Sequence, residues 1–146
     1  MNAKQMWDNF IQLHPKYQDS AYSAWSYGAI PDQLAELTLK NIKTATASAY
    51  DLYAIDNDPL PQINEFNIIL DSKDEAVCIT KTTKVSVIPF LEVSEEHAFK
   101  EGEGDRSLAT WRKDHTELFT QWYKEANLEF NENIPVVCEE FEVIYK

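Results

Sequence analysis

The segment LKNIKTATASAY, residues 39–50, contains two lysines, Lys40 and Lys43, and Lys43 directly precedes a run of alanine and small hydroxyl residues. Asparagine tolerates the left-handed backbone conformation that ends many helices, so Asn41 is expected to end a helix just before Lys43. One interpretation is that Lys43 neutralises the negative end of that helix. The other is that Lys43 packs against the Thr46 hydroxyl in a partly dry pocket and activates it. Side chains three apart in a regular strand point to opposite faces, so the second interpretation requires the chain to turn between them.

The segment EGEGD, from Glu101 to Asp105, contains two of the three glycines of the chain. Glycine permits backbone shapes and close approaches that other residues resist. One interpretation is a solvated loop in which Asp105 caps the following helix. The other is a general acid/base or a cation site. A helix-loop-helix calcium site would need a longer ligand pattern, which is absent.

The remaining metal-binding and nucleophilic residue types offer weaker signals. His14, His97 and His115 show no HxxxH or HExxH spacing, so metal-dependent hydrolysis has little support. His115 falls on the apolar stripe of its helix and is expected to be a hydrogen-bonded core residue. Cys78 and Cys138 lie in apolar runs without a CxxC motif and are expected to be reduced and buried. No metal and no cofactor are expected.

Two aromatic residues, Trp25 and Tyr27 in AWSYG, could stack on a nucleobase. Packing in the hydrophobic core is the favoured alternative, because tryptophans in a small domain are mostly structural.

The pattern along the chain predicts the elements that must position these residues. Apolar spacing predicts helices over 3–13, from Pro31 to the residues before Asn41, over 95–100 after a Ser94 cap, and from Asp105 onward. The segment around WSYG is expected to be irregular. Strands are predicted over 44–53, 66–71, 76–90, with a bend near Thr82, and 135–146. This order is not a strict alternation of strands and helices, so the chain is assigned to the α+β class.

Length and charge limit the possible partners. The chain has 146 residues, which fits one domain, and 13 basic residues against 25 acidic ones give a net charge of −12. Binding along a nucleic-acid backbone needs clustered lysine and arginine, so strong sequence-independent binding is disfavoured. The N-terminus lacks a secretory signal and no apolar run could span a bilayer, so a soluble, cytoplasmic protein without membrane association is expected.

Four segments together resemble the ASCH domain family: WSYG, LAELTLKNIKTATASAY, EGEGDRSLATWRKDH and VVCEEFEVIY. The resemblance covers about Trp25 to Tyr145, in order. The family hallmark G-x-K-x-x-T is here Asn41-Ile42-Lys43-Thr44-Ala45-Thr46, with asparagine in place of glycine. It implies a small, mixed, mostly antiparallel β-barrel similar to the PUA domain, flanked by helices. Residues 1–146 would form one such domain, with residues 1–24 as an N-terminal helical extension packed on it.

The same resemblance implies a site and an activity. Some small ASCH proteins are amidohydrolases that remove the acetyl group from acetylated cytidine, which implies Lys43, Thr46 and Glu101 as the catalytic set here. Thr46, or a water activated by Glu101, would attack the acyl carbon. Glu103 competes with Glu101 for the acid/base role. Residues expected to contact substrate are Trp25, Tyr27, Glu103, Asp105 and Arg112.

Three functions therefore stay open at this point. They are a hydrolase acting on a small nucleoside-like ligand, a non-catalytic RNA- or nucleotide-binding module, and a ribonuclease acting on single-stranded RNA. For the hydrolase, Lys43→Ala is expected to remove most activity with little loss of fold.

Overall fold

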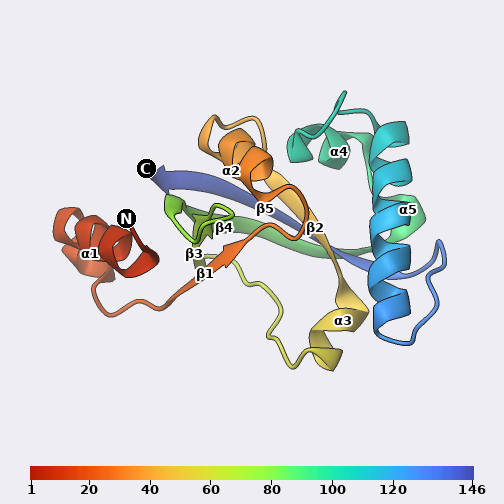
Figure 1. Ribbon diagram of the computed structural model, residues 1–146, viewed down its shortest axis with the longest axis horizontal. Coiled ribbons are helices and arrows are strands. Elements are labelled where there is room, and N and C mark those ends of the chain that lie inside the picture. The colour runs from red at the N-terminus through yellow and green to blue at the C-terminus, as the bar shows by residue number, and fades with distance from the viewer.

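A curled five-stranded sheet forms the centre of the protein, whose computed structural model describes residues 1–146 (Figure 1). β1 pairs in parallel with β3, and all the other neighbouring strands pair antiparallel. Across the sheet the strands follow the order β1 (Tyr22–Ser26), β3 (Phe66–Leu70), β4 (Ala76–Pro89), β5 (Pro135–Tyr145) and β2 (Ala45–Ala49). The sheet is a half-barrel of mixed, mostly antiparallel strands, which confirms the predicted fold class.

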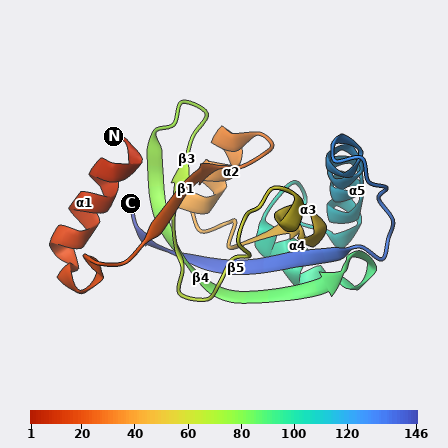
Figure 2. The same ribbon diagram turned by 90° about the horizontal axis from the view of Figure 1, so that it is seen from below.

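Five α-helices cover this sheet. Figure 2 shows α2 to α5 on one side of the long strands β4 and β5, with α1 at the opposite end of the molecule from α5. The helices are α1 (Ala3–Leu13), α2 (Pro31–Leu39), α3 (Tyr50–Ile55), α4 (Glu95–Glu101) and α5 (Leu108–Glu125), with short 3₁₀ turns at Pro15–Tyr17 and Phe90–Glu92. The two longest strands, β4 and β5, therefore lie beneath α2 to α5 (Figure 2).

Several local signals act as the sequence predicts. Pro31 occupies the first turn of α2, where its missing N–H costs nothing. The Ser94 side chain accepts a hydrogen bond from the His97 N–H and caps α4. The pairing of β4 with β5 shifts register between Thr82 and Lys84, which is the predicted bend.

Two predicted elements are wrong. The segment around WSYG was expected to be irregular, but Tyr22–Ser26 is an edge strand whose register partner in β3 is Phe66–Leu70. The predicted strand over 44–53 ends at Ala49, and Tyr50–Ile55 is a helix instead. β2 pairs only with β5, and Ala49 pairs with Val136, which is one residue from the end of β5 at Pro135, so little partner strand is left beyond it.

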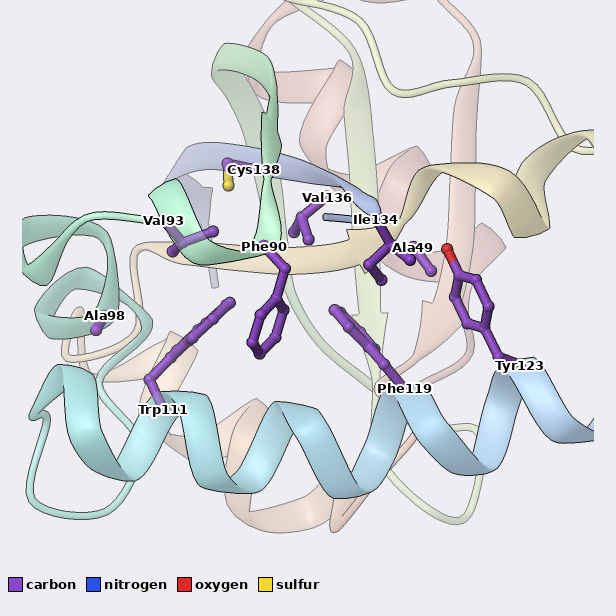
Figure 3. Packing of buried hydrophobic residues seen from close by; sticks show 10 residues of the cluster. All are labelled: Ala49, Phe90, Val93, Ala98, Trp111, Phe119, Tyr123, Ile134, Val136 and Cys138. Carbon is purple, nitrogen blue, oxygen red and sulfur yellow. The ribbon is translucent and has the colours of Figure 1, made fainter. Parts of the chain in front are cut away.

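A hydrophobic cluster fixes α5 against the sheet. Figure 3 shows Trp111, Phe119 and Tyr123 pointing from α5 toward Phe90 and the strands. All four side chains are buried. A fully buried side chain of this size stabilises the fold by about 1.5–3 kcal/mol. The cluster comprises Ala49, Phe90, Val93, Ala98, Trp111, Phe119, Tyr123, Ile134, Val136 and Cys138.

The other end of the sheet has a cluster of its own. Met6, Trp7 and Phe10 from α1 pack on Phe66 and Ile79. The N-terminal helix is thus attached through apolar contacts, and its capping box between Asn2 and Gln5 fixes where it begins.

The two cysteines are reduced and buried, as predicted. Burial raises the pKa of both thiols, Cys78 and Cys138, to about 12. They are packing residues rather than reactive ones.

Candidate functional site

The corner from α2 into β2 carries Lys43. Asn41 has a φ of 60°, the left-handed conformation predicted from its residue type. Its N–H donates to the Thr38 carbonyl, and the Ile42 N–H donates to the Leu37 carbonyl, each at 3.0 Å. This is the Schellman arrangement that closes a helix. The chain therefore turns sharply at Asn41, and Lys43 enters the interior before β2 begins at Ala45.

Lys43 is a buried cation with a complete set of partners. Its side chain is 1% exposed. The Nζ atom donates to the Ala45 carbonyl at 2.9 Å and to Glu103 Oε2 at 2.8 Å, and it lies 3.5 Å from Glu101 Oε1. It also sits 5.3 Å from the centre of the Tyr27 ring, where the aromatic face attracts a cation. An unpaired ammonium could not be kept here, so these partners are what make the burial possible.

Glu101, at the end of α4, is the inner partner of Lys43. Its Oε2 accepts hydrogen bonds from His97 Nε2, at 2.8 Å, and from Trp111 Nε1. Its Oε1 faces Lys43 and lies 3.6 Å from His115 Nε2. Burial by itself would raise the pKa of Glu101, but the charge of Lys43 and the hydrogen bonds from the two histidines outweigh it and hold the pKa well below its usual value. Glu101 is therefore an ionised anchor.

His115 has a role beyond the core packing predicted for it. Its Nδ1 lies 2.8 Å from the Trp111 carbonyl, and because a carbonyl only accepts, Nδ1 carries a proton. Its Nε2 gains most from Glu101 when it is protonated too. Burial alone would lower the pKa of His115, but the hydrogen bond and charge of Glu101 raise it above 6.5. His115 also lines the cavity described below.

The glycine loop places Glu103 on the other side of Lys43. Gly102 ends α4 with a φ of 74°, and a Cβ there would lie 2.5 Å from the Ile42 carbonyl oxygen. Glycine is thus required by both conformation and space. Glu103 follows with 30% of its side chain exposed, whereas Glu101 has 1%. The two carboxylates differ in that Glu103 alone can move into open space.

A cavity of about 520 Å³ opens beside these groups. Its size falls in the range of small-molecule sites. It brings together six of the predicted site residues, namely Trp25, Tyr27, Lys43, Thr46, Glu101 and Glu103. The chain makes the turn that convergence of Lys43 and Thr46 requires, because the Lys43 ammonium folds back onto the carbonyl of Ala45, the residue before Thr46.

The two aromatic residues of the predicted site, Trp25 and Tyr27, differ in how deeply they are buried. Tyr27 is buried and its hydroxyl bonds to Thr38 Oγ1 at 2.8 Å, so it is mainly a packing residue beneath Lys43. Trp25 is half-buried, and its ring meets Tyr27 edge to face at 5.1 Å. Its Nε1 donates to Asn67 Oδ1 at 2.9 Å. Trp25 is the better placed of the two to contact a ligand.

Two other predicted residues do not reach the cavity. Asp105 was expected to cap α5, but the cap is Ser107, whose side chain accepts from the Thr110 N–H. Asp105 instead accepts from the Ser107 N–H at 2.9 Å, which forms a turn before the helix. Arg112 donates to the carbonyls of Leu91 and Val93, so its guanidinium fastens α5 to the preceding loop.

The sequence-based prediction missed Glu139. It lines the cavity from β5, directly across from Thr46 on β2, and it is 9% exposed. A signal for it exists in PVVCEEF: Val137 and Phe141 occupy inward positions of an alternating strand, and Glu139 lies between them. An acidic residue at an inward position of a strand indicates a functional site, because a carboxylate there is not explained by core packing.

The sequence model of the ASCH domain matches residues 23–145. The chain belongs to the ASCH domain family. No curated protein shows significant similarity to it.

Solved ASCH domain structures share the whole fold. An ASCH domain from Lactobacillus crispatus JV V101 is 28% identical with a TM-score of 0.90, covering 98% of this chain and 94% of that one. A protein from Enterococcus faecalis V583 is 30% identical with a TM-score of 0.87, covering 99% of this chain and 88% of its own. A hypothetical protein at 17% identity and a TM-score of 0.56, covering 85% of this chain and all of its own, shares the fold alone.

None of the helices of this ASCH domain protein is both long enough and apolar enough to cross a bilayer.

Proposed function

We propose that this ASCH domain protein is a hydrolase that cleaves an amide bond in a small nucleoside-like ligand, with acetylated cytidine as the first substrate to try. The observation that carries the proposal is the arrangement around one ligand-sized cavity. A buried ammonium, an accessible carboxylate 2.8 Å from it, and a threonine hydroxyl all line the same cavity. These are the group types that acyl transfer needs, namely an oxyanion partner, a base and a nucleophile.

Lys43 is best suited to stabilise the oxyanion. Its Nζ lies within 3.5 Å of two carboxylates, and an ammonium has donors to offer and no lone pair with which to act as a base. A substrate carbonyl that approached Lys43 would take the position of the Glu103 carboxylate. Donors fixed in a dry site stabilise the charge that develops on this oxygen during attack.

Glu103 is the carboxylate suited to proton transfer. Glu101 is held ionised by four donors and has almost no exposed surface, so its proton exchange with substrate is hindered. Glu103 would take a proton from water or from the Thr46 hydroxyl as the oxygen bonds to the acyl carbon. The carbonyl electrons move to the oxygen beside Lys43. When they return, the C–N bond breaks and the leaving amine takes the proton from Glu103. If Thr46 is the nucleophile, a water then releases the acid.

The charge of the cavity supports a small ligand over an RNA strand. Five carboxylates line it, from Asp58, Glu65, Glu101, Glu103 and Glu139, and Lys43 is the only lysine or arginine among them. A polyphosphate backbone would meet repulsion there. This agrees with the net charge of −12.

Release of acetate from acetylated cytidine tests the proposal. Glu103→Gln and Thr46→Val should each reduce kcat/KM by ~10²–10⁴-fold if the group takes part in proton transfer or attack. The exposed residues Glu142 and Thr83 provide matched controls, because Glu142→Gln and Thr83→Val make the same chemical changes outside the cavity. No acetate release by the wild type would end the amidohydrolase proposal.

Measuring both the activity and the stability of the variants distinguishes the role of Glu103 from that of Glu101. Glu103→Gln should lose activity with only a small drop in the urea midpoint, because Glu103 is 30% exposed and Glu101 still compensates Lys43. Glu101→Gln should lower the midpoint further, because it removes the fully buried charge beside Lys43. A Glu101→Gln protein that is inactive but fully stable, together with an active Glu103→Gln protein, would return the acid/base role to Glu101.

A further inference from the structure

Glu139 is a buried carboxyl group without a cationic partner. No lysine, arginine or histidine forms an ion pair with it, and its one hydrogen bond is from Thr82 Oγ1 to Oε2, at 2.7 Å. No fully buried side-chain oxygen in the protein lacks a partner, so the unpaired Oε1 has to be accessible. The space that Glu139 lines is the cavity. Its free oxygen is therefore an acceptor offered to a ligand.

The surroundings of Glu139 disfavour its negative charge unless a ligand compensates that charge. Burial raises the pKa of Glu139, the hydrogen bond from Thr82 partly opposes this, and the nearby charge of Glu65 raises it further. A buried acid beside a second acid favours a ligand that donates hydrogen or carries positive charge. The ionised carboxylate would repel a phosphate at the same place, and a ligand oxygen without a proton has nothing to donate to it.

The register places this acceptor next to the reacting groups. Glu139 and Thr46 are directly paired across β5 and β2, and both line the cavity. Side chains paired in this way have Cβ atoms roughly 4.5–5.5 Å apart. A ligand group that touches Glu139 is thus a near neighbour of the group that meets Thr46 and Lys43.

Asn67 supplies the complementary donor. It is 6% exposed and lines the same cavity from β3. Trp25 Nε1 can only donate, so the Asn67 oxygen faces Trp25 and the amide nitrogen is left for the cavity. Like Glu139 Oε1, this nitrogen is without a protein partner. One wall therefore offers an acceptor and another offers a donor.

From this geometry we infer that Glu139 is the specificity residue of the cavity. It accepts a hydrogen bond from an amino or other N–H donor on an uncharged or cationic, unphosphorylated ligand, while Asn67 donates to an acceptor on the same ligand. The inference rests on the proposed ligand site, but it makes a statement about recognition and not about hydrolysis. The edge of cytosine, with an amino donor next to ring acceptors, has the matching pattern, and uracil presents an oxygen in place of that amine.

Calorimetric titration with cytidine, uridine and cytidine 5′-monophosphate tests this. The wild type should bind cytidine about tenfold or more tightly than uridine, since a wrongly matched polar contact costs about that factor. The 5′-monophosphate should bind more weakly than cytidine. Glu139→Gln can donate as well as accept, so the cytidine-to-uridine ratio should fall to within about threefold. Glu139→Asp, which withdraws the carboxylate, should lower the ratio too, and Glu142→Gln on the same strand should keep it.

Three results would overturn the inference. They are a wild type that binds none of these ligands, a wild type that binds uridine or the monophosphate at least as well as cytidine, and a Glu139→Gln ratio equal to that of the wild type. The outcome is independent of turnover. Selective binding that collapses in Glu139→Gln without any acetate release would refute the hydrolase and leave the specificity residue standing. Acetate release together with a cytidine-to-uridine ratio that is unchanged in Glu139→Gln would refute the specificity role of Glu139 and leave the hydrolase standing.

Discussion

Lys43 is the residue at which a substitution tests the structural argument most directly. Its side chain is 1% exposed and its ammonium lies between Glu101 and Glu103. Replacement by methionine keeps most of the volume and removes the charge. Glu101 would then remain buried without the cation that compensates it. Removing one partner of a buried ion pair typically costs 3–5 kcal/mol, so Lys43→Met should lower the free energy of unfolding by about 3 kcal/mol or more.

A double-mutant cycle separates this charge effect from packing. Glu101→Gln alone should destabilise the protein, but in the Lys43→Met background neither charge is left unpaired. The two costs should therefore fall short of additivity by about 1–3 kcal/mol. Lys40→Met is the matched control. Lys40 pairs with Glu36 with both side chains more than half exposed, so the change should cost no more than about 0.5 kcal/mol.

The assay is urea unfolding at pH 7, followed by the fluorescence of the tryptophans. The slope of the free energy with urea should stay the same among the variants, so that midpoints can be compared. A Lys43→Met protein as stable as the wild type, or a cycle in which the two costs simply add, would refute the argument. The expectation that a Lys43 variant keeps its fold with little loss is thus replaced by one of clear destabilisation, and activity data on such variants need this control.

Three further predictions concern the backbone and the charges around the site. The pKa of Glu101 is lower in the folded protein than in the unfolded chain, so the unfolded chain takes up a proton first as the pH falls below about 4.5. The contribution of Glu101 to stability should therefore be complete above that pH and be lost as acid is added. Acid unfolding of the wild type and of Glu101→Gln, measured side by side, checks this. Asn41→Ala should cost about 1–2 kcal/mol in urea unfolding, whereas Asn41→Gly should be nearly neutral, because only alanine resists a φ of 60°. Gly102→Ala should destabilise by at least about 1 kcal/mol and weaken ligand binding by displacing Glu103, since its Cβ would clash with the Ile42 carbonyl; thermal unfolding and calorimetry measure the two effects.

Local sequence signals predicted much of the fold. Helix α1, the Pro31 start of α2, the Ser94 cap and the bend near Thr82 all follow from propensity, capping and side-chain period. Asn41 is the clearest case, because a residue type that tolerates a left-handed φ was enough to locate the end of a helix.

Where the prediction failed, long-range pairing decided the outcome. Tyr22–Ser26 is a strand because β3 is available to pair with it, and that neighbour lies more than 40 residues away in the sequence. The helix Tyr50–Ile55 replaces a predicted strand although its two tyrosines and its isoleucine favour β structure. Capping was wrong at Asp105, since Ser107 two residues later is also a good cap and starts the helix.

The sequence by itself determined the turn at Asn41, the acidic charge balance, and the identity of Lys43 and Thr46 as residues of interest. Tertiary structure decided how the acids are arranged around them and how accessible each one is. It buried Glu101 under two histidines, left Glu103 accessible, carried Arg112 away from the cavity and brought Glu139 opposite Thr46. The physical reason is that a local signal depends on a residue and its near neighbours in the chain, whereas the charge and reach of a carboxylate depend on groups that only the folded sheet and helices bring within a few ångströms.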